Sequence, residues 1–414
     1  MPFYSTPGVI IQEVQGPKTI SPVGTSTAGF VGQAPDIGAH LGEAVAVNNW
    51  SQFRTEFAPG DDARSTWLSH AVYGFFRNGG SRCFIVNVPD TESIAGKDRP
   101  RTGLKLLEEI DEVAIVAAPG RCDPGSHEAL LAHCEFNGDR VCICDPPNIT
   151  NTELLKTVET AAVPTDTKSD DKTTDKPAKD SPDAKAKAAG GARPRISLGG
   201  YGTYYYPWLY VQDPLDPKAD QPPVAVPPSG HMAGIWARTD GTRGVHKAPA
   251  NVPVVGAVNL TYRVTGPEQG ELNSRGINCI RFFSKDGILV WGARTLADDS
   301  SEWRHLNVRR LAIMIKESIR RSNSWAVFEP NDRTLWKTLR SEVTGFLRNV
   351  YADGALMGAT PEEAFFVKCD EETNPPESID LGQVVTVIGI APVKPAEFII
   401  FKIGQLSGLD EEKL

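Results

Sequence analysis

Apolar runs alternate with helical patterns between residues 104 and 147, and this alternation limits the possible folds more than any other part of the chain. VAIVAAPG (113–120) and RVCICDPP (140–147) are short apolar runs that end in turn residues, as buried strands do. LKLLEEI (104–110) and HEALLAHCEF (127–136) carry apolar residues at helical spacing. Strands that alternate with helices form parallel sheets covered on both faces. We therefore expect an α/β fold, with an α+β character overall.

Further elements extend this pattern on both sides. Residues 67–76 place apolar side chains on one face of a helix, and a buried strand that ends at Val88 follows. YGTYYYPWLYV (201–211) reads as an aromatic strand, and PSGHMAG (228–234) as the start of a helix. The segment NCIRFFSKDGILVWGARTL (278–296) is predicted to be another long strand.

Two amphipathic helices follow. Asn307 is a suitable N-terminal cap for the first, and the basic residues Lys337, Arg340 and Arg348 lie off the apolar stripe of the second. A one-turn helix, with Thr360 as its expected cap, and the strand AFFVKC come next. The apolar stripes consist of Val308, Leu311, Ala312, Ile315 and Ile319 in the first helix, and of Leu335, Leu339, Val343, Phe346, Leu347 and Val350 in the second.

Residues 164–195 interrupt the globular pattern. The 414-residue chain is 40% hydrophobic and 23% charged, which is typical of folded domains with substantial cores. The segment 164–195 instead alternates Asp with Lys and holds few apolar residues. Its apolar surface is too small to offset the entropy that ordering would cost. We expect an exposed, flexible insertion.

Charge, hydropathy and cysteine usage exclude several classes of protein. The net charge of −9 provides no general attraction for nucleic acid or an anionic membrane. No run approaches the roughly 18 apolar residues of a membrane helix, and MPFYSTPGVII lacks the pattern of a signal peptide. The seven cysteines are irregularly spaced, which suits a reducing compartment. We therefore expect a soluble chain that assembles in the cytoplasm, binds no nucleic acid and does not insert into a membrane.

Two short motifs resemble the surroundings of a catalytic serine. GTSTAG (24–29) places Ser26 in a Gly-Thr-Ser-x-Ala turn, but only the N-terminal segment precedes it, so the expected Asp and His are missing. PSGHMAG contains Ser229 and His231, but a Ser and a His two residues apart seldom face each other, so a structural helix start is favoured. Asp145 ends a strand where α/β enzymes place reactive groups, and a loop cap explains it equally well.

A group of cysteines and histidines raises the question of a metal site. The group consists of Cys122, His127, His133, Cys134, Cys142 and Cys144. It has no CxxC pair. Cys142 and Cys144 lie within an apolar strand, and His133 and Cys134 fall on adjacent faces of a helix, so buried small hydrophobic residues are the favoured interpretation. Neither GxGxxG nor GxxxxGK[ST] occurs, and the tyrosines between 201 and 210 lack the interleaved basic residues of a base-stacking surface. The sequence predicts no catalytic residue, no cofactor and no metal.

Strand-like runs occupy both ends of the chain. The segment 383–405 contains VVTVIGI and AEFIIFKI, joined through Pro392 and Pro395, and residues 9–14 form a shorter run. A long apolar strand with a free edge pairs readily with another chain. Eight residues such as 396–403 span roughly 26 Å. At about 1 kcal/mol net for each hydrogen bond, such a strand would contribute several kcal/mol to an interface.

Several long segments, taken together, resemble the contractile tail sheath proteins of phages and phage-like injection systems. The similarity covers most of the chain, apart chiefly from the insertion. The matching segments are YSTPGVIIQEV (4–14), SPVGTSTAGFVG (21–32), YYPWLYV (205–211), VPPSGHMAGIWARTDGTRGVHKAPAN (226–251), GINCIRFFSKDGILVWGARTL (276–296), HLNVRRLAIMIKESIRRSNSWAVFEPND (305–332), and the end from DGALMGATPEEAFFVKCDEETN to PVKPAEFIIFKI.

This resemblance implies a structural protein without enzymatic activity. Sheath proteins stack as hexameric rings around an inner tube, between a baseplate and terminator or cap proteins. The core is expected to be subtilisin-like in topology without its catalytic triad, and the terminal arms are expected to pair with neighbouring subunits. The implied parts are an N-terminal β-arm (1–22), a first part of the core (23–95), a subtilisin-like region with the insertion (96–250), a C-terminal sheath core (251–380) and a C-terminal β-arm (381–414).

The same resemblance suggests which residues act in assembly. The basic side of the helix 333–350, with Lys337, Arg340 and Arg348, is a candidate surface for acidic residues of the tube, and a solvated helix face explains the pattern as well. The candidate arm residues are Val9, Ile10, Ile11, Val14, Phe398, Ile399, Ile400, Phe401 and Ile403.

Three hypotheses about function follow. The first is a contractile sheath subunit of a phage tail or phage-like injection particle, which switches from a metastable extended state to a contracted one and drives the tube through a target envelope. The second is an α/β hydrolase-like enzyme that uses Asp145, Ser229 or His231. The third is a static tube or shell built through the same arms. The resemblance favours the first hypothesis.

Overall fold

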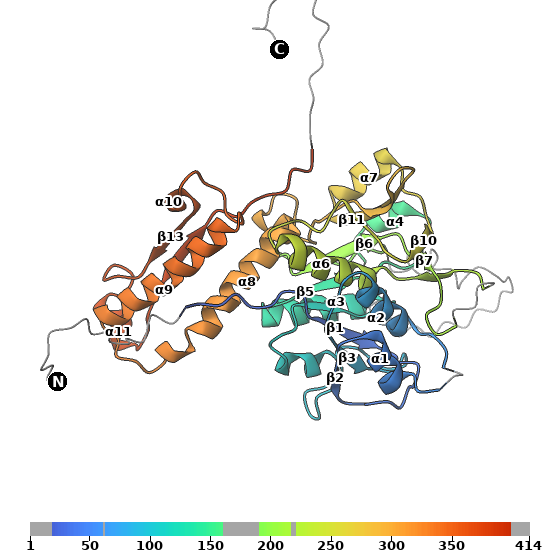
Figure 1. The fold of residues 1–414 in the computed structure, drawn as a ribbon, viewed down its shortest axis with the longest axis horizontal. Helices are drawn as coiled ribbons and strands as arrows, with labels where there is room; N and C mark the ends of the chain where they lie inside the picture. The colour runs from blue at the N-terminus through green and yellow to red at the C-terminus, as the bar shows by residue number, and fades with distance from the viewer. Residues whose placement is uncertain (1–18, 61–62, 160–189, 217–220, 399–414) are drawn as a thin grey trace, which may run out of the picture. The chain divides into compact units, whose positions relative to one another are not determined.

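The computed structural model describes most of the chain (Figure 1). The chain forms two compact units. The smaller unit contains residues 1–23 and 315–392, and the larger unit contains residues 24–314 and 393–414. The described residues are 19–60, 63–159, 190–216 and 221–398.

A nine-stranded mixed sheet forms the centre of the larger unit, in the order β2-β3-β1-β4-β5-β6-β11-β12-β9. The six strands from β3 to β11 in this order are parallel, whereas β2, β12 and β9 pair antiparallel with their neighbours. The strands are β1 (Ala28–Gly32), β2 (Ala44–Val47), β3 (Cys83–Asn87), β4 (Ile115–Ala117), β5 (Val141–Cys144), β6 (Gly202–Tyr206), β9 (Val252–Pro253), β11 (Ile277–Phe283) and β12 (Gly287–Val290). The predicted parallel sheet is confirmed for the central strands.

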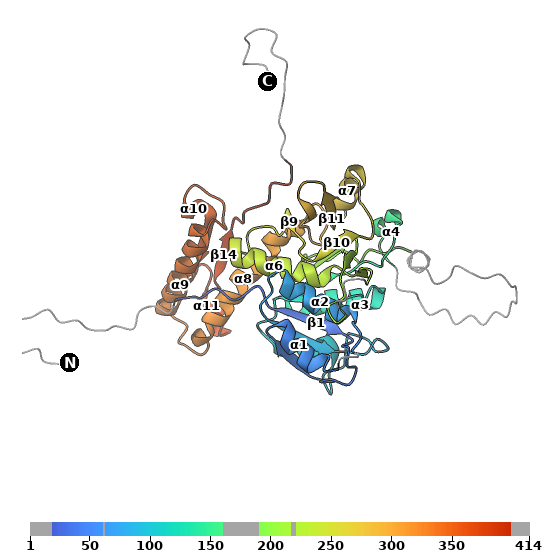
Figure 2. The ribbon, with the colours of Figure 1, turned by 45° about the vertical axis from the view of Figure 1, so that its right-hand side comes forward.

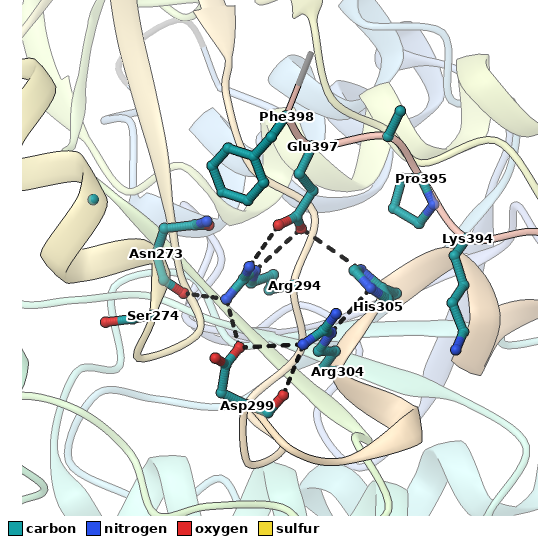
Figure 3. A pocket seen from close by; sticks show the side chains of 12 residues that line it. Asn273, Ser274, Arg294, Asp299, Arg304, His305, Lys394, Pro395, Glu397 and Phe398 are labelled. Carbon is teal, nitrogen blue, oxygen red and sulfur yellow. Dashed lines mark hydrogen bonds and ion pairs between the residues drawn. The ribbon is translucent and has the colours of Figure 1, made fainter. Parts of the chain in front are cut away.

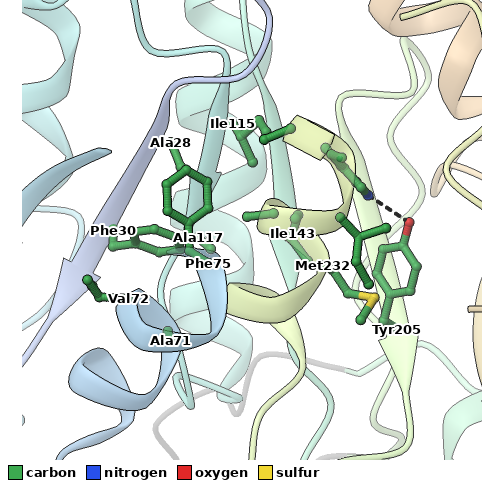
Figure 4. Packing of buried hydrophobic residues seen from close by; sticks show 14 of the residues in the cluster. Ala28, Phe30, Ala71, Val72, Phe75, Ile115, Ala117, Ile143, Tyr205 and Met232 are labelled. Carbon is green, nitrogen blue, oxygen red and sulfur yellow. Dashed lines mark hydrogen bonds between the residues drawn. The ribbon is translucent and has the colours of Figure 1, made fainter. Parts of the chain in front are cut away.

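Helices cover both faces of this sheet, because successive strand residues point to opposite sides. In β4, Ile115 and Ala117 join one buried cluster while Val116 joins the other, and β5 alternates in the same way. The first cluster includes α1 (Trp50–Phe57), α2 (Trp67–Arg77) and α6 (Ser229–Arg243). α2 lies beside both α1 (Figure 2) and α6 (Figure 4). The second cluster includes η1 (Gly103–Glu109), α3 (Pro124–Asn137), α4 (Thr152–Lys156) and α7 (Gly266–Asn273). This layered arrangement buries apolar side chains on both faces of the sheet.

Some predicted elements take a different form. Residues 103–109 form a 3-10 helix rather than an α-helix. The aromatic run divides into β6 and β7 (Leu209–Val211), and β7 pairs with β8 (Val224–Val226) and β10 (Ala257–Leu260) in a separate sheet. The run predicted as one strand over 278–296 is instead the hairpin β11–β12. Gly287 has a φ of 80° at its turn, a conformation that suits glycine.

The smaller unit is built around α9 (Arg333–Ala352), whose predicted apolar stripe is buried. Asp332 caps α9 by accepting hydrogen bonds from the backbone N–H groups of Thr334 and Leu335 at 2.9 and 2.8 Å. A small core joins Leu335, Trp336, Leu339 and Cys369. The remaining elements are η3 (Ser324–Ala326), α10 (Pro361–Ala364), β13 (Phe365–Lys368), α11 (Pro376–Asp380) and β14 (Val387–Ile390).

Two cap predictions need correction. The helix α8 (Leu306–Ser322), preceded by η2 (Glu302–Arg304), begins before Asn307, so Asn307 is not its cap. The amide of Asn307 instead donates to the carbonyl oxygens of His246 and Val393 at 2.8 and 2.9 Å. Thr360 precedes α10 as expected, but its side chain makes no capping hydrogen bond. Val308, Leu311 and Ile315 of the α8 stripe are buried, and Ala312 and Ile319 are half-buried.

Candidate functional site

Ser229 and Asp145, two of the residues considered for catalysis, are in direct contact. The Ser229 hydroxyl donates to one carboxylate oxygen of Asp145 at 2.6 Å, and the Ser229 N–H donates to the other at 2.9 Å. Gly120 N–H also donates to Asp145, at 3.2 Å. Burial raises the pKa of Asp145 to about 6, although the hydrogen bonds from Ser229 and Gly120 oppose the rise. Asp145 thus joins the loop after β4, the end of β5 and the start of α6.

No imidazole is placed to activate Ser229. His231 packs against α2, where a Cβ on Gly74 would lie 2.5 Å from the ring, and burial lowers the pKa of His231 to about 3. Nε2 of His127 lies 2.9 Å from the carbonyl oxygen of Asp145, and its Nδ1 lies 2.8 Å from Glu159. Since Ser229 is fully buried and pairs with a carboxylate, the group lacks the nucleophile and base geometry of a hydrolase.

The GTSTAG turn has a structural explanation as well. The Thr25 hydroxyl donates to Asp240 at 2.6 Å, and Arg310 donates to the Thr25 carbonyl oxygen at 2.9 Å. Asp240 and Arg310 form a bidentate ion pair, and each of their side chains is only 4% exposed. The turn is therefore held by a buried ion pair that sequence reasoning missed, because its members lie far apart in the chain.

The cysteine and histidine group does not form a metal site within the described part of the chain. Cys134, Cys142 and Cys144 are buried and free, and the sulfur atoms of Cys142 and Cys144 lie 3.9 Å apart. Burial raises the pKa of the Cys134 and Cys142 thiols well above the ordinary value. A metal binds the thiolate form, which this environment disfavours.

The smaller unit contains a sheet of two strands. Phe365, Phe366, Val367 and Lys368 of β13 pair antiparallel with Ile390, Gly389, Ile388 and Val387 of β14. Among the described residues, neither strand has a second full-length neighbour, and one isolated bridge joins Leu356 to Pro392. Phe366 is 56% exposed and packs over Gly389, where a Cβ would lie 2.1 Å from its ring. A two-stranded sheet is marginal by itself, and its free edges are able to accept further strands.

β14 lies in the first half of the apolar run 383–405. Residues 393–398 have no secondary structure, and Phe398, one of the predicted arm residues, is 75% exposed. The other predicted arm residues, Val9, Ile10, Ile11, Val14, Ile399, Ile400, Phe401 and Ile403, lie outside the described residues. Their role stays a prediction.

The predicted tube-facing residues Lys337, Arg340 and Arg348 are exposed on α9. Lys337 and Arg340 line a hollow of about 400 Å³ together with Asp370, Glu371 and Glu372, which follow β13. Arg333, at the start of α9, forms an ion pair with Glu371. This surface therefore carries an acidic rim beside the basic one. The run DEE at 370–372 was the signal in the sequence that could have revealed it.

A second hollow, in the larger unit, is lined in part by residues 394–398 (Figure 3). Arg294, Arg304, His305 and Lys394 line it, together with Asp299 and Glu397. Arg294 forms two hydrogen bonds with the carboxylate of Glu397, at 3.1 and 2.5 Å. Burial acts to raise the pKa of Glu397, but the hydrogen bonds and the charge of Arg294 lower it below the ordinary value.

The fold defines a class of protein: a mixed α/β chain with a large mixed sheet in one unit and, among the described residues, a separate two-stranded sheet in the other. No helix in the described part of the chain has the length and apolarity needed to cross a bilayer. Residues 173–296 match the family model of the phage tail sheath protein central domain, and residues 298–405 match that of the phage tail sheath C-terminal domain. Together these matches cover more than half of the chain. The chain belongs to the tail sheath protein family, as the sequence resemblance predicted.

Individual relatives agree with this assignment. A tail sheath protein of Vibrio phage KVP40 is 29% identical over 177 residues, which are 42% of this chain and only 26% of that relative's length. Two solved structures match nearly the whole chain. One is the sheath complex of the extracellular contractile injection system PVC in its contracted state, with a TM-score of 0.73, 28% identity and coverage of 98% of this chain and 99% of that one. The other comes from the 6-fold symmetrised baseplate of the anti-feeding prophage, with a TM-score of 0.70, 28% identity and coverage of 97% and 99%.

Proposed function

We propose that this protein is the subunit of a contractile sheath in a phage tail or a phage-like injection particle. In this proposal, subunits stack as hexameric rings around an inner tube and switch from a metastable extended state to a contracted one, which drives the tube through a target envelope. The similarity to a sheath complex solved in its contracted state supports switching rather than a static tube. The similarity to a chain of a 6-fold symmetrised baseplate supports six subunits per ring.

The incomplete β13–β14 sheet is the observation that carries this proposal. Neighbouring subunits would complete it with terminal strands, the N-terminal run 9–14 and the C-terminal run 396–403. Each added strand would satisfy unpaired backbone groups along an edge and cover exposed side chains such as Phe366 and Val387. Several hydrogen bonds of about 1 kcal/mol each would then hold neighbours together while the cores change orientation.

The switch needs no nucleotide at the sheath in this proposal. A preference of a few kcal/mol per subunit for the contracted state is sufficient when many subunits change together. Contacts with the tube, the baseplate and a terminator or cap protein would hold the extended state. The larger unit supplies the rigid body, with the subtilisin-like topology that the family resemblance implies and without a catalytic triad. Assembly would take place in the cytoplasm of the producing cell.

The tube contact is proposed to involve Lys337, Arg340 and Arg348 on the exposed side of α9. Among the described residues, no ion pair engages the charged groups of Lys337 and Arg340, although Asp370, Glu371 and Glu372 share their hollow. An acidic surface of the tube would therefore meet basic groups that are available, and it would compete with the acidic rim of the same unit. A solvated helix face is the alternative.

Negative-stain microscopy of the purified chain, alone and with its tube protein, tests the proposal. Striated hollow cylinders are expected from the full-length chain. Deletion of residues 396–414 is expected to leave single subunits, because the second half of the apolar run is lost. Deletion of residues 406–414 is the matched control, and it should preserve the cylinders because it keeps that strand. Dispersed full-length subunits with hydrolytic activity would favour the enzyme hypothesis, and cylinders that survive the longer deletion would remove the role of the C-terminal strand.

A further inference from the structure

Arg294 holds Glu397 in a fixed geometry just before the end of the described chain (Figure 3). Its Nε and Nη2 atoms donate to the two carboxylate oxygens of Glu397 at 3.1 and 2.5 Å. Its Nη1 atom donates to Asp299 at 2.7 Å and to the carbonyl oxygen of Asn273 at 3.1 Å. With its side chain only 9% exposed, Arg294 has little freedom to follow Glu397 if the segment moves.

A second side chain holds the same segment four residues earlier. Asn307 is buried in α8 and donates from its side-chain amide to the carbonyl oxygen of Val393 at 2.9 Å. The same amide donates to the carbonyl oxygen of His246 at 2.8 Å, which fixes its orientation. The segment 393–397 is therefore attached to the larger unit at both of its ends. Because residues 393–398 form no strand or helix, these side-chain contacts replace the backbone pairing that a strand would provide.

The charges that line the hollow make the Glu397 carboxylate the main electrostatic attachment of the segment 393–397 to the larger unit. Arg294, Arg304 and Lys394 bring three positive charges to the hollow, against the carboxylates of Asp299 and Glu397. His305 also faces Glu397, with its Nδ1 atom 3.6 Å from the carboxylate. Loss of the Glu397 charge would leave a positively charged hollow with a single carboxylate, and the segment would lose its main attraction to the larger unit.

We propose that Arg294 is a positioning residue, which through Glu397 fixes the point where the C-terminal segment leaves the larger unit. This inference rests on the proposed function, in which residues 396–403 pair with a neighbouring subunit. A load applied to that strand would pass through Glu397 and Arg294 to the sheet of the larger unit. Without the ion pair between Arg294 and Glu397, the segment 393–397 would detach from the larger unit of its own subunit. The displacement of one subunit would then not be transmitted to the next.

Limited chymotrypsin digestion of the isolated subunit, read by mass spectrometry, tests the attachment. Cleavage after Phe398 requires the residues around it to enter the protease as a free segment, so an attached Glu397 should slow it. Arg294→Gln leaves the sequence of the segment unchanged and is expected to speed this cleavage about tenfold, because local opening becomes easier. Asp286→Asn, an exposed carboxylate in the β11–β12 turn, is the control and should not change the rate.

The charge-swapped variant Arg294→Glu/Glu397→Arg restores opposite charges at these two positions and should return cleavage toward the wild-type rate. It also carries Asp299→Asn, because a carboxylate at position 294 would otherwise face that of Asp299. The same proteins are then compared for assembly. Arg294→Gln should form far fewer cylinders than the wild type at a temperature where circular dichroism shows both proteins fully folded, and the charge-swapped variant should recover part of the loss. Unchanged cleavage after Phe398, or faster cleavage with normal cylinders, would overturn the positioning role. A wild type that forms no cylinders would overturn the proposed function and the load-transfer role, while digestion would still decide whether Arg294 holds the segment.

Discussion

Replacement of Gly234 by alanine is expected to destabilise the larger unit, although alanine favours a helix. Gly234 lies in α6 where this helix contacts α2. A Cβ added there would lie 2.4 Å from the carbonyl oxygen of Phe75 and 2.8 Å from Cβ of Asn78. Gly241 lies in the same helix, and a Cβ there would have no atom within 4 Å. Gly241→Ala is therefore a matched control for the effect of helix propensity alone.

The magnitude follows from these contacts. Alanine in place of glycine stabilises a helix interior by about 1 kcal/mol, and this is the whole effect expected for Gly241→Ala. At Gly234, α2 has to move by roughly 1 Å to restore an ordinary contact distance, and overpacking of this kind costs about 1–3 kcal/mol. The movement also disturbs Asn78, which exchanges hydrogen bonds of 3.0 and 2.9 Å with the backbone of Val255, at about 1 kcal/mol each. We expect a net loss of about 2–4 kcal/mol in the free energy of unfolding.

Urea unfolding followed by circular dichroism measures this difference. The midpoint should fall for Gly234→Ala and rise for Gly241→Ala, with an unchanged slope in both variants. A rise of the midpoint in both would refute the packing argument. That result would also reopen the interpretation of the PSGHMAG segment, which the contact between α2 and α6 now explains without catalysis.

Three further predictions concern pH and charge. Burial lowers the pKa of His133 to about 4, so between about pH 6.5 and pH 4 the unfolded chain binds this proton while the folded chain largely does not. This difference in proton binding at His133 should lower the free energy of unfolding by about 2 kcal/mol between pH 7 and pH 5. Urea unfolding of His133→Gln should show a smaller loss of stability over the same pH range. The raised pKa of Asp145, about 6, acts in the opposite direction as the pH falls from 6 towards 4, so Asp145→Asn should make the acid loss larger. Charge reversal at Lys337 and Arg340 should abolish tube-filled extended sheaths in negative stain. Charge reversal at the exposed turn residue Lys285 is the control and should preserve them. Extended sheaths from the first variant would contradict the proposed tube contact.

The sequence by itself determined the layered core of the larger unit. Apolar runs such as 113–120 and 140–147 are bounded by turn residues, and the predicted helix 127–136 between them has one apolar face. The local pattern therefore predicts strands of a parallel sheet with apolar side chains buried on both of its faces. The stripe of α9 was predicted for the same reason. In each case the spacing of neighbouring residues decides which side chains are able to leave water together.

Only the tertiary structure decided the contacts between distant residues. Asn307 has the chemistry of a helix cap, but it binds the carbonyl oxygen of Val393, 86 residues later. Within the described part of the C-terminal run, residues 383–398, Val387–Ile390 is the segment that forms a strand, because its partner β13 is supplied by another part of the chain. Arg294 and Glu397 are 103 residues apart, and no local pattern marks them as partners. Periodicity encodes burial, whereas ion pairs and strand pairing depend on which distant segments the topology brings within a few ångströms.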